Sequence, residues 1–186
     1  MATSKTGSFY LTESVILPAA SGSGTRVQGT IDLGAYVNVP TGQAIAVESV
    51  DFITQGDSAG DFQTTLGTMC AAANMALGAQ LTDLNPGTLF VRADNQSLVA
   101  SSQLQIDRAN NVGTHTNDLF PDNHGPASLS EAFLVVNDQM YLVVGNDNDA
   151  TGAVDISITA RIKCRVVKLS TKDWMAIAIQ STAADN

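Results

Sequence analysis

The chain has few charges, few cations and few aromatic rings, and these shortages exclude several classes of function. Charged residues make up 15% of its 186 residues, against about 25% in an average domain. Nine basic residues oppose 18 acidic ones, giving a net charge of −9, so we expect no direct nucleic-acid binding. Apolar runs fall far short of the roughly 20 residues that a membrane-spanning helix needs. No apolar segment follows the N-terminal lysine as it would in a signal peptide.

Cysteine is equally scarce. The two cysteines, Cys70 and Cys164, lie far apart in the chain, and neither belongs to a CxxC motif of the kind that binds zinc. Each lies in an apolar stretch, which predicts two small core residues. A single disulfide between them is the alternative.

The sequence also lacks the common catalytic motifs. It contains no GxSxG, HExxH or Walker A sequence, so we expect neither enzymatic activity nor a cofactor. Its two histidines share one polar segment with two aspartates, as His115, Asp118, Asp122 and His124. Imidazole and carboxylate groups suit a divalent metal, but a solvated loop explains the same residues and is the preferred interpretation.

The acidic residues are mostly aspartate, which outnumbers glutamate fifteen to three. Short carboxylates suit a protein in concentrated salt, where screening removes most of the self-repulsion; an acidic protein from ordinary water is the alternative. One acidic segment, NDND at 146–149, resembles the start of a calcium loop. It lacks the glycine and glutamate that complete an EF-hand, so a hairpin turn is preferred.

The clearest pattern present is a strict alternation near the C-terminus. Every even position from 154 to 166 is apolar, which predicts a half-buried strand. The odd positions include Arg161, Lys163 and Arg165, which form a basic stripe. Such a stripe is either a solvated strand face, paired with acidic neighbours across the sheet, or a complementary contact with an acidic neighbouring subunit.

Shorter apolar segments separated by turn residues predict about eight strands in all, and therefore an antiparallel sandwich or barrel. We expect strands over 25–39 and 44–54, and a strand in preference to an alanine-rich helix over 70–81. The apolar runs 131–136 and 140–144 flank Asn-Asp and predict a hairpin.

These patterns divide the chain into three parts. An N-terminal arm occupies 1–24 and contains one extended segment, and a single β domain occupies 25–170. A long exposed loop is expected at 107–129, where it would carry contacts. A short helix and tail occupy 171–186, with a capping Ser or Thr at its start. Trp174 and Ile177 give this helix an apolar face that either folds back on the domain or anchors a neighbouring subunit.

Four segments carry a resemblance to a known family. TIDLGAYVNV (30–39), QAIAVESVDF (43–52), QLTDL (80–84) and SLVASS (97–102) resemble the strands of single jelly-roll capsid proteins. The group that the chain resembles is the small major capsid protein of icosahedral, internal-membrane viruses of halophilic archaea, the sphaerolipovirus-like viruses. The resemblance covers roughly 25–180 and rests on diffuse pattern, without a short diagnostic motif.

The resemblance implies an eight-stranded jelly roll standing upright in a viral shell. It implies a virion protein that packs with copies of itself and with a larger jelly-roll capsid protein into pseudo-hexameric capsomers. The shell encloses a membrane, which the subunit would contact, and is assembled in the host cytoplasm. No catalytic residue transfers. From the residues themselves, we expect the basic stripe, Trp174 and Ile177 to carry subunit contacts.

Two other classes of function remain as alternatives. A ligand- or carbohydrate-binding β-sandwich, of a receptor-binding or spike type, would need aromatic side chains on loops, and aromatic residues are only 5% of this chain. A cupin-type enzyme would need histidines on strands around a metal, whereas both histidines here lie in one segment.

Overall fold

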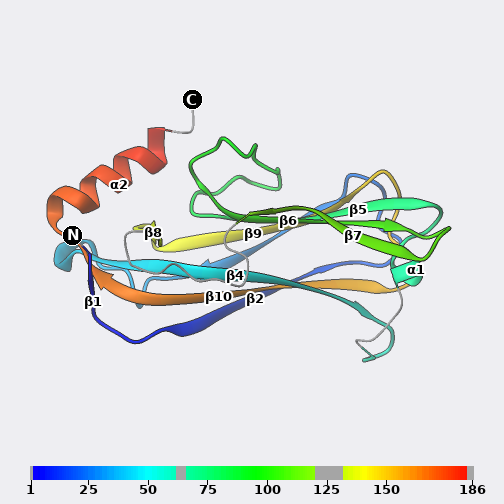
Figure 1. Cartoon of the computed structure of the whole chain (residues 1–186), viewed down its shortest axis with the longest axis horizontal. Coiled ribbons are helices and arrows are strands. Elements are labelled where there is room, and N and C mark those ends of the chain that lie inside the picture. The colour runs from blue at the N-terminus through cyan, green and yellow to red at the C-terminus, as the bar shows by residue number, and fades with distance from the viewer. Residues whose placement is uncertain (1, 62–65, 120–131, 184–186) are drawn as a thin grey trace.

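The computed structural model describes residues 2–61, 66–119 and 132–183, which form two facing antiparallel β-sheets and a C-terminal helix (Figure 1). Sheet A contains β1 (Thr3–Ser4), β2 (Phe9–Leu17), β10 (Asp155–Lys168), β4 (Gln43–Asp57) and β8 (Phe133–Val135). Sheet B contains β3 (Arg26–Asp32), β9 (Gln139–Asp147), β5 (Asn74–Thr82), β6 (Leu98–Asp107) and β7 (Val112–Leu119). The helical elements are η1 (Val39–Thr41), α1 (Leu66–Met69) and α2 (Thr171–Ala183).

The order of the strands identifies the fold as a jelly roll. Strands β2, β10, β4 and β8 lie side by side in one sheet, and β3, β9, β5 and β6 lie side by side in the other. Most strands that are consecutive in sequence therefore belong to opposite sheets, which is the arrangement of a double-sheet jelly roll. The predicted all-β jelly roll with a short C-terminal helix is confirmed. Two strands are additions, since β1 pairs with the end of β10 and β7 pairs with β6.

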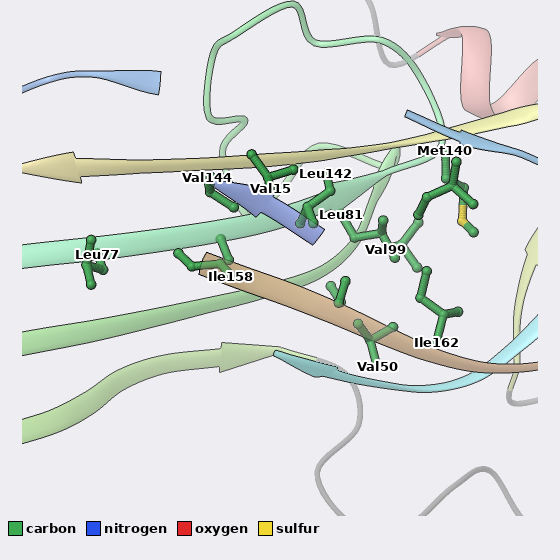
Figure 2. Close-up of a cluster of buried hydrophobic side chains, with 14 of the residues drawn as sticks. Val15, Val50, Leu77, Leu81, Val99, Met140, Leu142, Val144, Ile158 and Ile162 are labelled. Atoms are coloured by element: carbon green, nitrogen blue, oxygen red, sulfur yellow. The ribbon is translucent and has the colours of Figure 1, made fainter. Parts of the chain in front are cut away.

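The core lies between the two sheets. The even residues of β10, from Ile156 to Val166, are all buried and point inward, as the alternation predicted. Figure 2 shows Ile158 and Ile162 in a cluster with side chains from β2, β4, β5, β6 and β9. Cys70 and Cys164 are both buried as free thiols, and burial raises the pKa of the Cys164 thiol to about 12.

The hairpin predicted at 131–144 is wrong. Strand β8 pairs with β4 in sheet A, whereas β9 pairs with β3 and β5 in sheet B. The connection at 136–138 carries the chain from one sheet to the other. Its residues bond elsewhere: Asp138 O accepts from Leu33 N at 2.7 Å and Asn137 Nδ2 donates to Asp83 O at 2.9 Å. A turn signal marks where a strand ends and does not say which sheet receives the next one.

Several predicted boundaries also move. The arm expected at 1–24 contains β2, which pairs with β10 along its whole length and buries Val15 and Leu17. The loop expected at 107–129 contains β7, and its remainder from 120 onward lies outside the described residues. The strand expected over 25–39 ends as β3 at Asp32, because the backbone then turns and Val37 N donates to Leu33 O. The preference for a strand after Cys70 is confirmed by β5.

Helix α2 covers a second, smaller cluster on sheet A. Trp174, Ile177 and Ala178 pack against buried residues of β4, of β10 and of the segments that follow β8 and β10, namely Ala44, Ala46, Val136, Val167 and Leu169. The helix begins at the end of the molecule where the N-terminus lies (Figure 1). None of the helices within the described ranges is long and apolar enough to cross a bilayer.

Truncating a central residue of β10 should destabilise the whole sandwich. Ile162 is fully buried, and Ile→Ala substitutions at such sites cost about 2–5 kcal/mol through lost burial and the cavity left behind. We expect Ile162→Ala to lower the free energy of unfolding by that amount, seen as a lower urea midpoint. Ile16→Ala removes the same atoms from a side chain that is 55% exposed and should change the midpoint little. Equal losses in the two variants would contradict the assignment of inner and outer faces.

Candidate functional site

The outer surface of sheet A carries the basic stripe predicted from the sequence. Arg161, Lys163 and Arg165 occupy odd positions of β10, and the even positions face the core. Because side chains alternate along a strand, the three cations project from the opposite side of the sheet. The structure therefore brings all three to one face.

A buried glutamate partly neutralises this stripe. Glu48 is 3% exposed and lies where the pairing of β4 with β10 shifts register, since Lys163 pairs with Ser49 and Cys164 with Val47. Such a bulge re-aims a side chain. Glu48 forms an ion pair with Arg165, lies 3.8 Å from Lys163 Nζ and accepts a hydrogen bond of 2.8 Å from Ser8 Oγ. Pairing with an acidic neighbour across the sheet is thus present for two of the three cations.

The third cation lies over an exposed aromatic ring. Arg161 Cζ is 5.1 Å from the ring centre of Tyr10, and Tyr10 is 53% exposed. Ile16 and Ile53 are also large apolar residues left exposed. Tyr10 and Ile16 on β2 pair with Lys163 and Ser157 of β10, and Ile53 on β4 pairs with Thr159. All three partners are odd residues of β10, so the apolar residues lie on the same outer face.

We call these residues together the outer patch of sheet A: Tyr10, Ile16, Ile53, Arg161, Lys163 and Arg165. It mixes apolar, aromatic and cationic groups on a chain whose net charge is −9. Interfaces between proteins are enriched in Tyr and Arg in the same way. Sequence analysis found the cations and missed the apolar members. The alternation within 9–17 carries the signal for two of them, but only the register places them beside the stripe.

Helix α2 adds a second exposed apolar surface. Trp174 and Ile177, the expected subunit contacts, pack within the protomer on the second cluster. Met175 and Ile179 lie one helical turn apart and are 54% and 63% exposed. The helix begins with Ser170 Oγ accepting a hydrogen bond from Asp173 N at 3.2 Å, which confirms the predicted capping serine.

The four metal-ligand candidates are not brought together within the described part of the chain. His115 lies on β7 and is exposed, with Nδ1 3.5 Å from Ser102 Oγ. Asp118 belongs to the same strand, while Asp122 and His124 fall outside the described residues. Among the residues that the structure describes, no group of three or more His, Cys, Asp or Glu residues could hold a metal ion.

The first two residues of the NDND segment end β9, and its last two begin the connection to β10, where Asp149 serves a structural role. Asp149 Oδ2 accepts from Ala72 N at 2.7 Å and Ala73 N at 3.0 Å, and from Cys70 Sγ at 3.3 Å. The bond from Ala72 N is the main reason that the pKa of this carboxyl is lowered. The turn interpretation is favoured, although the turn joins β9 to β10 in the other sheet and is not a hairpin.

One buried carboxyl escaped sequence analysis. Asp83 follows β5 directly, is 2% exposed, and its Oδ1 has no hydrogen-bond partner among the described residues. Burial raises its pKa from 3.8 to about 7. The sequence carries only a weak signal, a single aspartate between Thr82 and Leu84, because its burial depends on the segment 83–97 folding back over sheet B.

No protein-family model and no curated protein sequence matches the chain. VP1 of Trichodysplasia spinulosa-associated polyomavirus, in complex with sialylated glycooligomers, is 11% identical over 86% of this chain and 95% of VP1, with a TM-score of 0.36. The unassembled VP1 pentamer of Washington University polyomavirus is 9% identical over 90% and 95% of the two chains, with a TM-score of 0.36. Desmodium yellow mottle tymovirus is 9% identical over 89% and 91%, with a TM-score of 0.30. The jelly-roll assignment rests on the strand order of this chain.

Removing the partner of Glu48 should cost more than neutralising Glu48 itself. Arg165→Met leaves a carboxylate that is 3% exposed with only Lys163 and Ser8 as partners, so we expect a loss below the roughly 3–5 kcal/mol of a fully unpaired buried charge. In Glu48→Gln the two cations, which are 31% and 40% exposed, still reach water, so we expect a smaller loss. The double variant should recover stability relative to Arg165→Met. Urea unfolding at pH 7 measures all three, and a double variant as unstable as Arg165→Met would contradict the pairing.

Asp83 should make the fold less stable as the pH rises. Its pKa is higher in the folded chain, about 7, than the ordinary value of 3.8, so the folded state favours the protonated form. The contribution of Asp83 to stability is therefore greatest below about pH 4, falls between pH 4 and 7 and levels off above. We expect Asp83→Asn to abolish this fall, because the amide cannot ionise, and to be the more stable form at pH 8.

Urea midpoints measured from pH 4 to pH 8 test this expectation. Asp94→Asn, an exposed change in the same segment, controls for the loss of one negative charge. Parallel curves for the native protein and Asp83→Asn would show that Asp83 is not the group responsible.

Proposed function

We propose that the chain is a small major capsid subunit, a structural protein of a virion. The observation that carries the proposal is the outer patch of sheet A. Tyr10, Ile16 and Ile53 are exposed on the same face as the three cations, and a shell subunit would bury this combination against a neighbour. The jelly roll supports the same role, because its packed sheets limit uncontrolled edge pairing and leave loops and termini to contact neighbours.

The outer patch suits a contact with an acidic partner. Arg161 lies over the Tyr10 ring, and such cation–π pairs strengthen when a partner removes water from them. A second copy of a chain with a net charge of −9 supplies carboxylates in abundance. In strong salt exposed ion pairs are weak, so the apolar members would contribute most of the affinity and the cations would orient the contact.

In the fuller proposal the subunit packs with copies of itself and with a larger jelly-roll capsid protein. Pseudo-hexameric capsomers then build an icosahedral shell over an internal membrane, assembled in the cytoplasm of a halophilic archaeal host. The family resemblance of the strands and the predominance of aspartate support this version. Met175 and Ile179 on α2, the residues before β2 and the segment 107–129 are the further contact regions.

The mass of the purified protein in solution tests the proposal. We expect light scattering to find large discrete assemblies in molar salt that dissociate or aggregate in dilute buffer. The double variant Tyr10→Ser/Ile53→Ser should lose assembly, because it removes two apolar members of the outer patch. Leu89→Ser changes an exposed apolar residue, 69% exposed, on a different surface and should assemble normally.

A 19.4 kDa species at every salt concentration, with and without candidate partner proteins, would contradict the proposal. It would favour the ligand-binding β-sandwich instead. If the double variant still assembles, the capsid role stands, but the outer patch is not a contact that assembly requires.

A further inference from the structure

Sheet B carries a hollow on the side of the sandwich opposite to the outer patch of sheet A. Its volume is about 160 Å³. Small residues of β5, the ring of Phe90 and polar residues of β6 and β9 line it. The residues that matter most are Ala76, Gly78, Phe90, Ser101, Gln103 and Asp147.

Glycine makes room for the aromatic wall. A Cβ atom on Gly78 would lie 2.7 Å from two carbons of the Phe90 ring, so the ring reaches the backbone of β5 only because this residue has no side chain. Gly78 pairs with Gly145 on β9, which widens the flat area. Arg26 crosses it with Cζ 4.4 Å from the centre of the Phe90 ring and Nη2 2.6 Å from Asp147 Oδ2.

Hydrogen bonds from side chains hold the segment that supplies Phe90. Both ends of the Gln80 amide bond the backbone of Val91, at 2.9 Å from Nε2 to O and 2.7 Å from N to Oε1. Gln28 Nε2 donates to Asn85 Oδ1 at 2.9 Å, which fastens the segment to β3. The hollow is therefore formed before any ligand arrives, and preorganisation of this kind reduces the ordering cost of binding.

The size and the lining together select a class of ligand. A cavity of about 150 Å³ holds a benzene ring, so this hollow of about 160 Å³ accommodates the ring atoms of one six-membered sugar, whose remaining hydroxyls would extend into solvent. Phe90 offers an apolar surface, while Ser101, Gln103 and Asp147 offer hydroxyl, amide and carboxylate groups that bond hydroxyls. An anionic ligand is disfavoured, because the carboxylate of Asp147 lies at the hollow and the nearby Arg26 already pairs with it.

We propose that this hollow binds a single neutral sugar ring, such as the terminal pyranose of a surface glycan. The C–H groups of the ring pack on Phe90, and its hydroxyls bond Gln103, Ser101 and Asp147. The site belongs to the protomer and goes beyond the capsid role, since it would let an assembled shell attach to a glycan-coated surface through the face that the outer patch does not use.

Saturation-transfer NMR on the purified protein tests the site with three probes: the methyl pyranosides of galactose, glucose and N-acetylglucosamine. We expect transfer to the ring protons of at least one of them and no transfer to the sialic acid ring of sialyllactose. Gln103→Ala should weaken binding about tenfold, because it removes an amide that would bond the ring hydroxyls. Gln105→Ala, two residues along the same strand, is the matched control and should bind normally.

Gly78→Ala is a second, independent test. Its methyl group would displace the Phe90 ring and should abolish binding. Circular dichroism should still show the native fold. Absence of transfer from all three neutral probes, or equal binding by Gln103→Ala and Gln105→Ala, would overturn the proposal. Light scattering on the same samples keeps the two proposals apart. An assembling protein that binds no sugar contradicts only the sugar site, and a monomer that binds sugar contradicts only the capsid role.

Discussion

The alternation of strand β10 is the constraint on which the rest of the structure depends. This strand pairs with β1 and β2 on one edge and with β4 on the other, so its two faces set the two faces of sheet A. Its even residues build the core, from Ile156 to Val166. Its odd residues then have to face outward, and they bring the cations and the exposed apolar residues of neighbouring strands onto one surface.

A bulge in β4 places an acidic residue beside the cations of that surface and so reduces their mutual repulsion in an isolated protomer. Three cations on one strand repel one another, and Glu48 counters two of them from a buried position. Because the carboxylate is buried and the cations are partly exposed, loss of a cation should destabilise the group more than loss of the carboxylate. Arg161 instead lies over the ring of Tyr10. Of all the contacts in the outer patch, this cation–π pair would strengthen most when a neighbouring protein excludes water from it.

The two sheets present different chemistry to the outside. Sheet A exposes large apolar and cationic side chains, which suit an extended contact with another protein. Sheet B is covered in part by the segment 83–97, which Gln80 and Asn85 fasten to the strands, and beside it lies a small polar hollow. That fastening also buries Asp83 without a partner for Oδ1, so the ordering of this segment carries a cost that grows with pH.

The sequence by itself determined the elements whose signals are local. The period of two in β10, the buried cysteines, the capped helix α2 and the all-β character all follow from residues close together in the chain. Tertiary structure alone decided which sheet each strand joined, and the hairpin expected at 131–144 failed for that reason. It alone placed Glu48 beside Arg165, Tyr10 beneath Arg161 and Phe90 against Gly78. Each of these contacts joins residues on different strands or loops, and their pairing depends on a register that no local pattern contains.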